Sequence, residues 1–572
     1  MKRLTIRRAS QNSRETDANQ PHSTQQAPAR PGVPERGWRW CWPNVAVAVS
    51  VAALVCVWAS VGIAADRLRI TQVPAWTMQR QADWPMWGAT PLRNMISAGG
   101  VSPLEWNATT GSNIKWTAKL GSKSYGEPVV SNGVIYVGTN NEAPRNPRIV
   151  ADGGVLMAFD ASTGEFLWQQ HTRKLPSGRV NDWPGEGLCS PVYVESGRLW
   201  YCTNRCEVMC LDISAGNRQR TEPPLLWSVN MMWQLGVFPH NMTRCSIAAY
   251  KDCIYVITAN GVDDIHKHVV APQAPDIVCF NKNTGQVVWS DNSPGPDILH
   301  SQWASVAIAT VGRRTLVIAP MGDSWVYAYE AQTGKIIWKF DLNPKKSVYP
   351  QTRNEVLASP CIVNWGNGKQ YMYIGNGQDP EHGEGKGHFY CVDITKEGDI
   401  SAELEVDPRP KVAIDKGPVN IGGEARRGKP NPNSGIVWEY EKFDLNHDGK
   451  LDRSEYMNRT ISTACVTPNQ LCFIPDFSGF LHCLDARTGK VYWTYDMESA
   501  IWASPMWANG MIYLADEDGE VRIFADSKTM KKLSPDDDHL SLGNAAYCSP
   551  IFVNGILYLT DRDTLFAIQQ RN

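Results

Sequence analysis

Asp160-Ala-Ser-Thr-Gly-Glu-Phe-Leu-Trp168 is a nine-residue phrase that this chain repeats three more times. The other copies are Asn281-Lys-Asn-Thr-Gly-Gln-Val-Val-Trp289, Glu330-Ala-Gln-Thr-Gly-Lys-Ile-Ile-Trp338 and Asp485-Ala-Arg-Thr-Gly-Lys-Val-Tyr-Trp493. In every copy the first polar residue, the Thr-Gly pair and the final Trp keep their spacing. Such a recurring phrase indicates a repeat architecture, in which each repeat is one supersecondary unit.

Each repeat is predicted to form four short antiparallel strands. The Thr-Gly pair indicates a tight turn, because Gly adopts positive φ without strain. The apolar residues that follow this turn, ending in Trp, predict the last strand of the unit. In the first full copy, Asn132-Gly133 is a strong hairpin signal between two apolar runs, and a third run, residues 155–160, leads into the phrase.

Eight such units can be counted between residue 111 and the C-terminus. The seventh has lost its Thr-Gly turn at Thr529-Met530, and the eighth has only three strands. Ile114-Lys-Trp116 has the terminal Trp but no repeat before it, so we expect it to supply the missing strand and close the ring. The sequence therefore predicts an all-β fold over residues 111–572, an eight-bladed β-propeller with four-stranded antiparallel blades.

The repeated Trp residues are expected to pack between neighbouring blades, where a large ring buries area and its N–H finds a partner. Four cysteines stand two residues before the polar position of the phrase, where other repeats have Ala. We expect them to be small buried hydrophobic residues. They are Cys210, Cys279, Cys391 and Cys483.

The residues before the repeats divide into three parts. Residues 1–43 are basic and rich in Gln, Ser, Pro and Arg, and they predict a disordered cytoplasmic tail. Residues 44–65 are uncharged and hold an apolar run from 45 to 65 that is long enough to span a bilayer, and the preceding basic residues predict export of the propeller. An uncleaved anchor is favoured over a signal peptide cut near Ala64. Residues 66–110 form a lead-in segment.

Residues 444–455, in the link between the fifth and sixth repeats, match the twelve-residue EF-hand loop, with Gly449 at the sharp turn. Oxygen ligands at this spacing suit Ca²⁺, and we expect one structural site that orders the link. The alternative is an acidic surface loop that matches by chance. The expected ligands are Asp444, Asn446, Asp448, Lys450 through its carbonyl group, Asp452 and Glu455.

Two polar loops are candidates for the mouth of the central channel, where they could hold a metal or another ligand. One spans residues 378–388 and the other precedes the third repeat. The alternative is that they are solvated loops with hydrogen-bonded histidines. The candidate residues are His240, Asp379, Glu381, His382 and His388.

The phrase ending at Trp493 resembles the repeat of pyrroloquinoline-quinone (PQQ) propellers, a superfamily that includes quinoprotein alcohol dehydrogenases and the barrel-assembly lipoprotein BamB. Asp83-Trp-Pro-Met-Trp-Gly88 and Arg93-Asn-Met are similar to the lead-in of such proteins. For the dehydrogenases, the resemblance implies a quinone that carries Ca²⁺ and stacks between a Trp and a disulfide of adjacent cysteines, beside an Asp base. This chain has no Cys-Cys dipeptide, so its residues do not support PQQ.

We therefore predict an exported, membrane-anchored propeller that acts as a non-enzymatic binding scaffold of the cell envelope. Its expected partners are an envelope protein or a small ligand. The formal net charge of −2 gives no electrostatic case for nucleic acid. The expected location is the bacterial inner membrane with the propeller in the periplasm or outside, or secretion after cleavage. The alternative function is a PQQ-dependent oxidoreductase of alcohols or sugars with a divergent active site.

Overall fold

The computed structural model describes residues 83–214, 221–408, 419–420, 425–535 and 540–570. The predicted tail, the predicted membrane segment and the first part of the lead-in, residues 1–82, lie outside this part of the chain. Among the described residues, no helix combines the length and the apolar character needed to cross a membrane. The description below concerns the compact unit that begins at Arg69.

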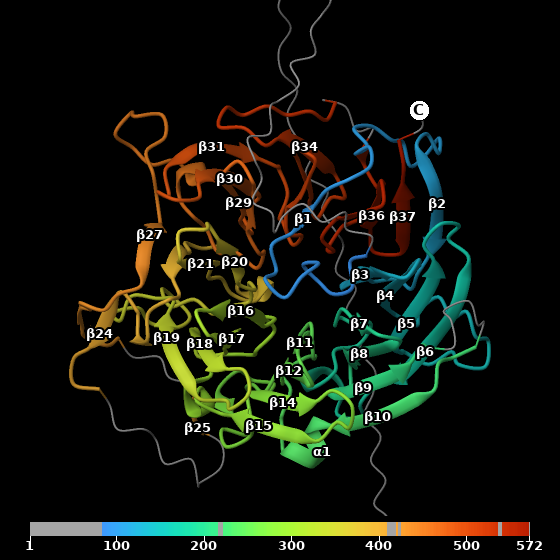
Figure 1. Cartoon of the computed structure of the whole chain (residues 1–572), viewed down its shortest axis with the longest axis horizontal. Coiled ribbons are helices and arrows are strands. Elements are labelled where there is room, and N and C mark those ends of the chain that lie inside the picture. The colour runs from blue at the N-terminus through green and yellow to red at the C-terminus, as the bar shows by residue number, and fades with distance from the viewer. Residues whose placement is uncertain (1–82, 215–220, 409–418, 421–424, 536–539, 571–572) are drawn as a thin grey trace, which may run out of the picture. The chain divides into compact units, whose positions relative to one another are not determined.

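The described residues form ten sheets, of which eight are arranged as blades around a central axis (Figure 1). Six blades are meanders of consecutive antiparallel strands. Blade 1 consists of β3 (Gly126–Ser131), β4 (Val134–Asn140), β5 (Gly153–Asp160) and β6 (Phe166–Arg173), and blade 2 of β7 (Tyr193–Glu195), β8 (Arg198–Cys202), β9 (Glu207–Asp212) and β10 (Leu225–Asn230). Blade 3 consists of β11 (Ala248–Tyr250), β12 (Cys253–Ile257), β14 (Ile277–Asn281) and β15 (Val287–Asp291), and blade 4 of β16 (Ala307–Val311), β17 (Arg314–Pro320), β18 (Trp325–Glu330) and β19 (Ile336–Asp341). Blade 5 consists of β20 (Cys361–Asn364), β21 (Gln370–Gly375), β22 (Phe389–Asp393) and β27 (Ile436–Tyr440), and blade 6 of β28 (Cys465–Val466), β29 (Leu471–Pro475), β30 (Phe480–Asp485) and β31 (Val491–Asp496).

The two remaining blades are completed by the N-terminal part of the chain. Blade 8 combines β35 (Ile551–Val553), β36 (Ile556–Thr560) and β37 (Thr564–Ile568) with β2 (Ile114–Lys119), which pairs antiparallel with β37. This confirms the predicted closure of the ring. In blade 7, β32 (Met506–Ala508), β33 (Met511–Ala515) and β34 (Val521–Ala525) are joined on the axial side by β1 (Ile96–Ser97), which runs parallel to β32.

The connections between the blade strands contain short secondary-structure elements. β13 (His268–Val269) pairs with β25 (Val419–Asn420), β23 (Gly398–Asp399) extends blade 4, and β24 (Glu403–Glu405) pairs with β26 (Gly428–Pro430). Helix α1 (Met231–Leu235) follows β10. Four 3-10 turns cover Gly178–Val180, Gly295–Asp297, Pro380–His382 and Arg453–Glu455.

At four junctions, the Trp at the end of one blade lies on the Thr-Gly turn of the next blade. Gly334 has a φ of 72°, and a Cβ built on it would lie 2.7 Å from the ring of Trp289 in blade 3. The Nε1–H of Trp289 donates to the carbonyl group of Ala331, in the same turn, at 2.9 Å. The phrase therefore encodes both partners of an interblade contact. The same contact joins Trp116 to Gly164, Trp227 to Gly285, and Trp438 to Gly489.

A belt of hydroxyl groups also links the blades close to the axis. In five neighbouring pairs, a backbone N–H before one inner strand donates to the hydroxyl group at the same position of the next blade, at 2.9–3.1 Å. These bonds give buried backbone groups a partner at the place where the inner edges of the sheets face the axis. The belt runs in the order Ser246, Ser305, Ser359, Thr463, Ser504 and Ser549.

The described part of the lead-in winds around the axis inside the ring and contacts every blade; it is the blue segment at the centre of Figure 1. Its backbone and side chains bond to the inner strands from Val130 in blade 1 to Phe552 in blade 8. Arg93 is completely buried and donates to the carbonyl groups of Ser246 and Val306 next to blades 3 and 4. The lead-in therefore lies inside the ring at the level of the inner strands.

The predicted burial of the four repeat cysteines is confirmed. Each lies in the third strand of its blade and is at most 1 % exposed. In the described part of the chain, all thirteen cysteines are free thiols.

The interblade contact predicts a large difference between two glycine substitutions in blade 4. Gly334→Ala introduces a side chain where the ring of Trp289 lies, in addition to the strain of positive φ. Gly312→Ala, the matched control, has a φ of 61° and no heavy atom within 4 Å of its Cβ. We expect the free energy of unfolding to fall by about 1–3 kcal/mol more for Gly334→Ala than for Gly312→Ala, because overpacking adds to the backbone strain. Urea denaturation of both variants measures this difference, and equal losses would contradict the contact.

Candidate functional site

A pocket of about 330 Å³ lies where the connections that lead into the inner strands converge. Its walls come from residues that precede these strands, such as Arg244 before β11, Leu357 before β20 and Ile461 before β28. The lead-in bonds to the inner strands themselves. The pocket, which we call the axial pocket, and the lead-in therefore occupy different levels along the axis.

Aromatic side chains form much of the wall of the axial pocket. They are Tyr125, Trp183, Trp303 and Trp502, and all four are partly exposed. Tyr547 supports two of them, because its ring stacks on Tyr125 with centroids 4.7 Å apart and meets the edge of Trp502 at 5.1 Å. The pocket thus presents several ring faces that are held in place by other rings.

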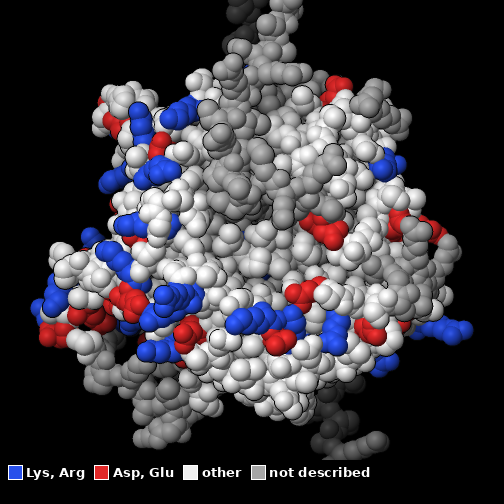
Figure 2. Space-filling view, viewed as in Figure 1, with Lys and Arg blue, Asp and Glu red and all other residues white. Residues whose placement is uncertain are grey.

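Charged groups of both signs complete the axial pocket. Lys123 is paired with Glu186 at 2.6 Å, whereas Arg244 has no hydrogen bond to any described residue. Burial raises the pKa of Glu127, near Arg244. On the face of the molecule shown in Figure 2, blue and red groups are interspersed and neither sign forms a continuous field, which agrees with the net charge of −2. Within the axial pocket itself, Lys123, Arg244 and Glu186 offer donors and acceptors to a ligand.

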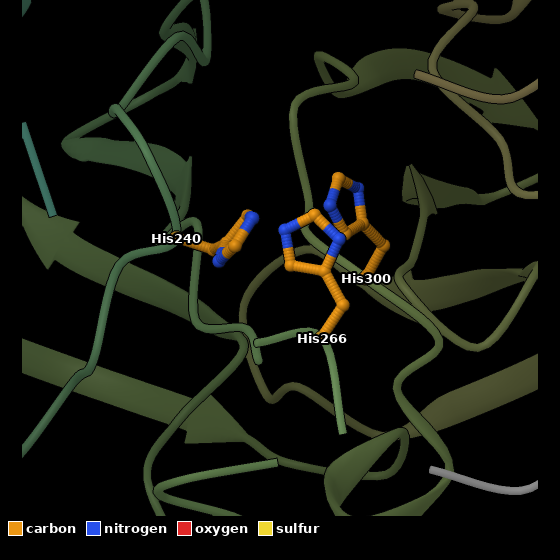
Figure 3. A group of neighbouring side chains, drawn as sticks. All are labelled: His240, His266 and His300. Carbon is orange, nitrogen blue, oxygen red and sulfur yellow. The ribbon is translucent and has the colours of Figure 1, made fainter. Parts of the chain in front are cut away.

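Three histidines from different connections meet next to the axial pocket, and their rings converge in Figure 3. His240 precedes blade 3, His266 lies in the loop between β12 and β13, and His300 precedes blade 4. One nitrogen from each lies within 4.8 Å of the other two, and the ring centroids are 4.5–4.8 Å apart. Burial lowers the pKa of His240 to about 2 and that of His300 to about 3, so both rings are neutral.

Carboxylates lie on the other side of His300. Its Nδ1 is 3.4 Å from Oε2 of Glu355 and 4.0 Å from Oδ2 of Asp379. Tyr349 donates its hydroxyl hydrogen to Oε1 of Glu355 at 2.9 Å. Burial raises the pKa of Glu355 to about 7 and also raises the pKa of Asp379. The cluster therefore combines neutral imidazoles with buried acids.

The structure brings three of the five predicted loop residues together: His240, Asp379 and His382, whose ring is 5.4 Å from that of His300. Glu381 lines the axial pocket and lies 3.9 Å from Arg179. His388 is elsewhere, with its Nδ1 2.7 Å from Glu439 Oε1.

Sequence reasoning did not select His266, His300 or Glu355. The run Asp263-Asp-Ile-His-Lys-His268 was the visible signal for His266. His300 lies in the connection to blade 4 and Glu355 in the connection to blade 5. Neither has another candidate ligand nearby in sequence at a spacing that would indicate a site. Only the order of the blades brings them together.

One buried carboxylate holds the loops that carry the cluster. Asp276 accepts hydrogen bonds from Nε2 of Gln302 at 2.7 Å, from Nδ2 of Asn260 at 3.1 Å and from the backbone N–H of Gly295 at 3.0 Å. Gln302 follows His300 by two residues, and Asn260 lies in the connection that leads to His266. Burial raises the pKa of Asp276 to about 7.

The predicted calcium loop lies between β27 of blade 5 and β28 of blade 6. Its two flanks pair through the N–H of Phe443 and the carbonyl group of Glu455, at 2.8 Å, where an EF-hand would have helices. Glu455 is 5 % exposed and accepts backbone N–H groups from Leu445, Asn446 and Asp452. These bonds lower the pKa of Glu455, the bond from Asp452 most of all. The backbone of the loop thus folds around the carboxylate of Glu455, the last acidic residue of the loop.

Eight four-stranded blades with this repeat define a propeller of the PQQ-like superfamily. The model of the family described as outer membrane protein assembly factor BamB matches residues 75–222, 273–370 and 435–571. These residues make up more than half of the chain, which therefore belongs to that family.

One curated relative and two solved structures extend this comparison. Tetrathionate hydrolase of Acidithiobacillus ferrooxidans is 22 % identical over 293 residues, and the match spans about half of each protein, 47 % of this chain and 49 % of the relative. The quinohemoprotein alcohol dehydrogenase from Comamonas testosteroni has a TM-score of 0.54 at 14 % identity, over 86 % of this chain and 82 % of its own. A europium-containing methanol dehydrogenase has a TM-score of 0.55 at 14 % identity, over 86 % and 98 %. At such identities the two structures share the fold alone.

The arrangement that the PQQ resemblance implies for a quinone is not present here. It requires a disulfide of adjacent cysteines over the axis, and the chain has no such pair. The cysteines in the connections that precede inner strands, such as Cys189 and Cys548, are buried free thiols. The residues of the axial pocket thus do not fit that mode of quinone binding.

Asp276 predicts a pH dependence of stability. Its pKa rises from 3.8 to about 7 on folding, so the unfolded chain loses this proton more readily, and the folded state loses stability as pH rises between about 4 and 7. In Asp276→Asn this contribution is absent. We expect the stability of the wild type relative to the variant to fall by up to roughly 1 kcal/mol per pH unit across this window. Urea denaturation at several pH values tests this, and parallel pH profiles would contradict it.

Proposed function

We propose that this protein is a non-enzymatic binding protein of the cell envelope that takes a small ring-shaped ligand in the axial pocket. The observation that carries the proposal is the wall of four aromatic side chains, Tyr125, Trp183, Trp303 and Trp502, around a pocket of about 330 Å³. Export and anchoring through residues 45–65 are part of the proposal. Membership of a family described as an outer membrane assembly factor supports the envelope.

The pocket suits a flat ligand with a polar rim, such as a sugar ring or a heterocycle. Small-molecule sites are concave and mostly apolar, with a few polar groups that fix orientation. Here the ring faces supply the apolar contact, and Arg244, Lys123 and Glu186 supply donors and acceptors. The guanidinium group of Arg244 has all of its hydrogen-bond donors available for a ligand, because it has no hydrogen bond to a described residue.

A non-enzymatic role agrees with the residues around the pocket. The adjacent cysteine pair that the quinoprotein resemblance implies is absent from the sequence. The name of the curated relative, tetrathionate hydrolase, gives the one specific reaction to be tested against this proposal.

Trp502→Ala should weaken ligand binding, because one stacking face is lost. The fluorescence of the full-length protein would be followed while PQQ and a panel of sugars are added, with tetrathionate as a ligand that has no ring. We expect at least one ring-shaped ligand to bind and its affinity to fall about tenfold or more in Trp502→Ala, since base–aromatic stacking is worth about 1–3 kcal/mol. Trp233→Ala is the matched control, because Trp233 on α1 is 83 % exposed.

The same samples separate binding from catalysis. Dye reduction with alcohols or sugars after addition of PQQ would replace the proposal with the oxidoreductase alternative. Consumption of tetrathionate would replace it with a hydrolase. Equal binding to wild type and Trp502→Ala, or no binding of any ring-shaped probe, would refute the pocket as the ligand site.

We further propose that residues 444–455 bind one Ca²⁺ that orders the link between blades 5 and 6. The loop has the required acidic and amide side chains, and Gly449 has a φ of 79° at the sharp turn. Oδ1 of Asp444 is buried without a hydrogen-bond partner, and an oxygen in that state suits a cation. The carboxylate of Glu455 accepts three N–H groups and offers about four lone-pair sites in all.

Glu455→Gln should weaken Ca²⁺ binding by about tenfold or more, a loss of about 1.4 kcal/mol, because an amide cannot act as a bidentate anionic ligand. Glu441→Gln is the matched control, since Glu441 is exposed in the same link and outside the loop. Calorimetric titration of both variants with Ca²⁺ gives the affinities. Wild-type affinity in Glu455→Gln would remove the site.

A further inference from the structure

We propose that His240, His266 and His300 bind a divalent transition metal ion, such as Zn²⁺, beside the axial pocket. This site is distinct from the calcium loop and from the stacking site of the proposed ligand, and it does not depend on either. Figure 3 shows that the three rings face a common space. One nitrogen of each lies within 4.8 Å of the others.

The first argument is the state of the buried nitrogens. His240 and His300 are both fully buried, and Nε2 of each has no hydrogen-bond partner among the described residues. Buried polar groups are almost always paired, because an unpaired one costs about 1–3 kcal/mol. Several unpaired nitrogens that meet at one point are therefore costly, unless a bound ion accepts their lone pairs.

The second argument is the orientation of the rings. Nδ1 of His240 donates to the carbonyl group of Val262 at 2.9 Å, so the lone pair is on Nε2. Nδ1 of His300 lies 3.4 Å from Oε2 of Glu355, close to a carboxylate but without a hydrogen bond to a described residue. Histidines that bind metals usually direct the other ring nitrogen to a carbonyl group or a carboxylate in this way, which fixes the ring and raises its basicity.

The ligand chemistry selects the class of ion. Imidazole suits Zn²⁺, Cu²⁺, Ni²⁺ and Fe²⁺, whereas Ca²⁺ and Mg²⁺ prefer oxygen. In a tetrahedral zinc site with Zn–N bonds of about 2.0–2.1 Å, the nitrogens lie about 3.4 Å apart. The distances between these nitrogens, now up to 4.8 Å, would therefore shorten by about 1.4 Å at most. His266 is partly exposed on a turn, so it is the ligand that can move most easily.

The site has room for a further ligand on the side of the axial pocket. Trp303 lines that pocket, and its ring is 5.4 Å from that of His300. Asp379, 4.0 Å from His300, also lines the pocket. Three protein ligands leave one open position on a tetrahedral ion. A metal bound here would thus lie in the wall of the axial pocket.

The test is a titration of the full-length, metal-depleted protein with Zn²⁺ in excess Ca²⁺, which keeps the calcium loop occupied. We expect one Zn²⁺ per chain, and at least a tenfold loss of affinity in each of His240→Gln, His266→Gln and His300→Gln. His388→Gln is the matched control, because His388 is paired with Glu439 away from the cluster, and it should bind as the wild type does. Co²⁺ should give the visible absorption bands of a tetrahedral nitrogen site in the wild type and the control only.

The buried histidines carry a risk of misfolding, which His266→Gln avoids because its side chain is partly exposed. Circular dichroism and urea denaturation of each variant show whether the propeller is intact. Binding of no Zn²⁺ by the wild type would overturn the proposal. Wild-type affinity in folded His266→Gln would also overturn it.

Discussion

The contact of a Trp ring with a side-chain-free Thr-Gly turn on the next blade is the interaction on which the ring depends. Trp289 covers Gly334 so closely that even a methyl group would collide with it. The ring N–H bonds to the same turn, so the contact fixes both the distance and the orientation of neighbouring blades. Gly is required twice at this position, once for positive φ and once for space. This contact recurs at four junctions between blades, and the hydroxyl belt near the axis links five neighbouring pairs, so together they fix how neighbouring blades sit against each other.

The fold could be predicted from sequence because both partners of this contact lie within one nine-residue phrase. The polar residue, Thr-Gly and Trp recur, so blade number and the closure by β2 followed from counting. The role of the lead-in could not be derived in this way. Its residues 84–97 bond to seven inner strands and to the connection before the eighth, and its own sequence has no repeat that would predict those partners. Blade 7 also contains β1 as a parallel strand next to the axis. The repeats predicted antiparallel strands only, so this strand was not expected.

The candidate site was predictable only in part, for a physical reason. Histidines such as His240 and His382 attracted attention because polar residues cluster near them in sequence. His300 and Glu355 have no such neighbours, and their proximity of 3.4 Å arises from the packing of blades 4 and 5. A site of this kind is built from connections, which differ from blade to blade, and so it leaves no periodic signal. The predicted calcium loop is the opposite case, since all of its expected ligands lie within twelve consecutive residues.

The blades are built from a repeated sequence, whereas the connections near the axis are not. Strands and turns must keep their residues, because each blade has to fit two neighbours; the connections before the inner strands face the axis and are free to vary. Function on a repeat scaffold is therefore expected where the connections converge. In this chain the lead-in lies inside the ring at the level of the inner strands, and Arg93 is fully buried there. The aromatic wall and the three histidines lie instead among the connections. The two candidate sites thus lie at one level of the axis, and a ligand that reached the aromatic wall at Trp303 would lie beside His300 as well.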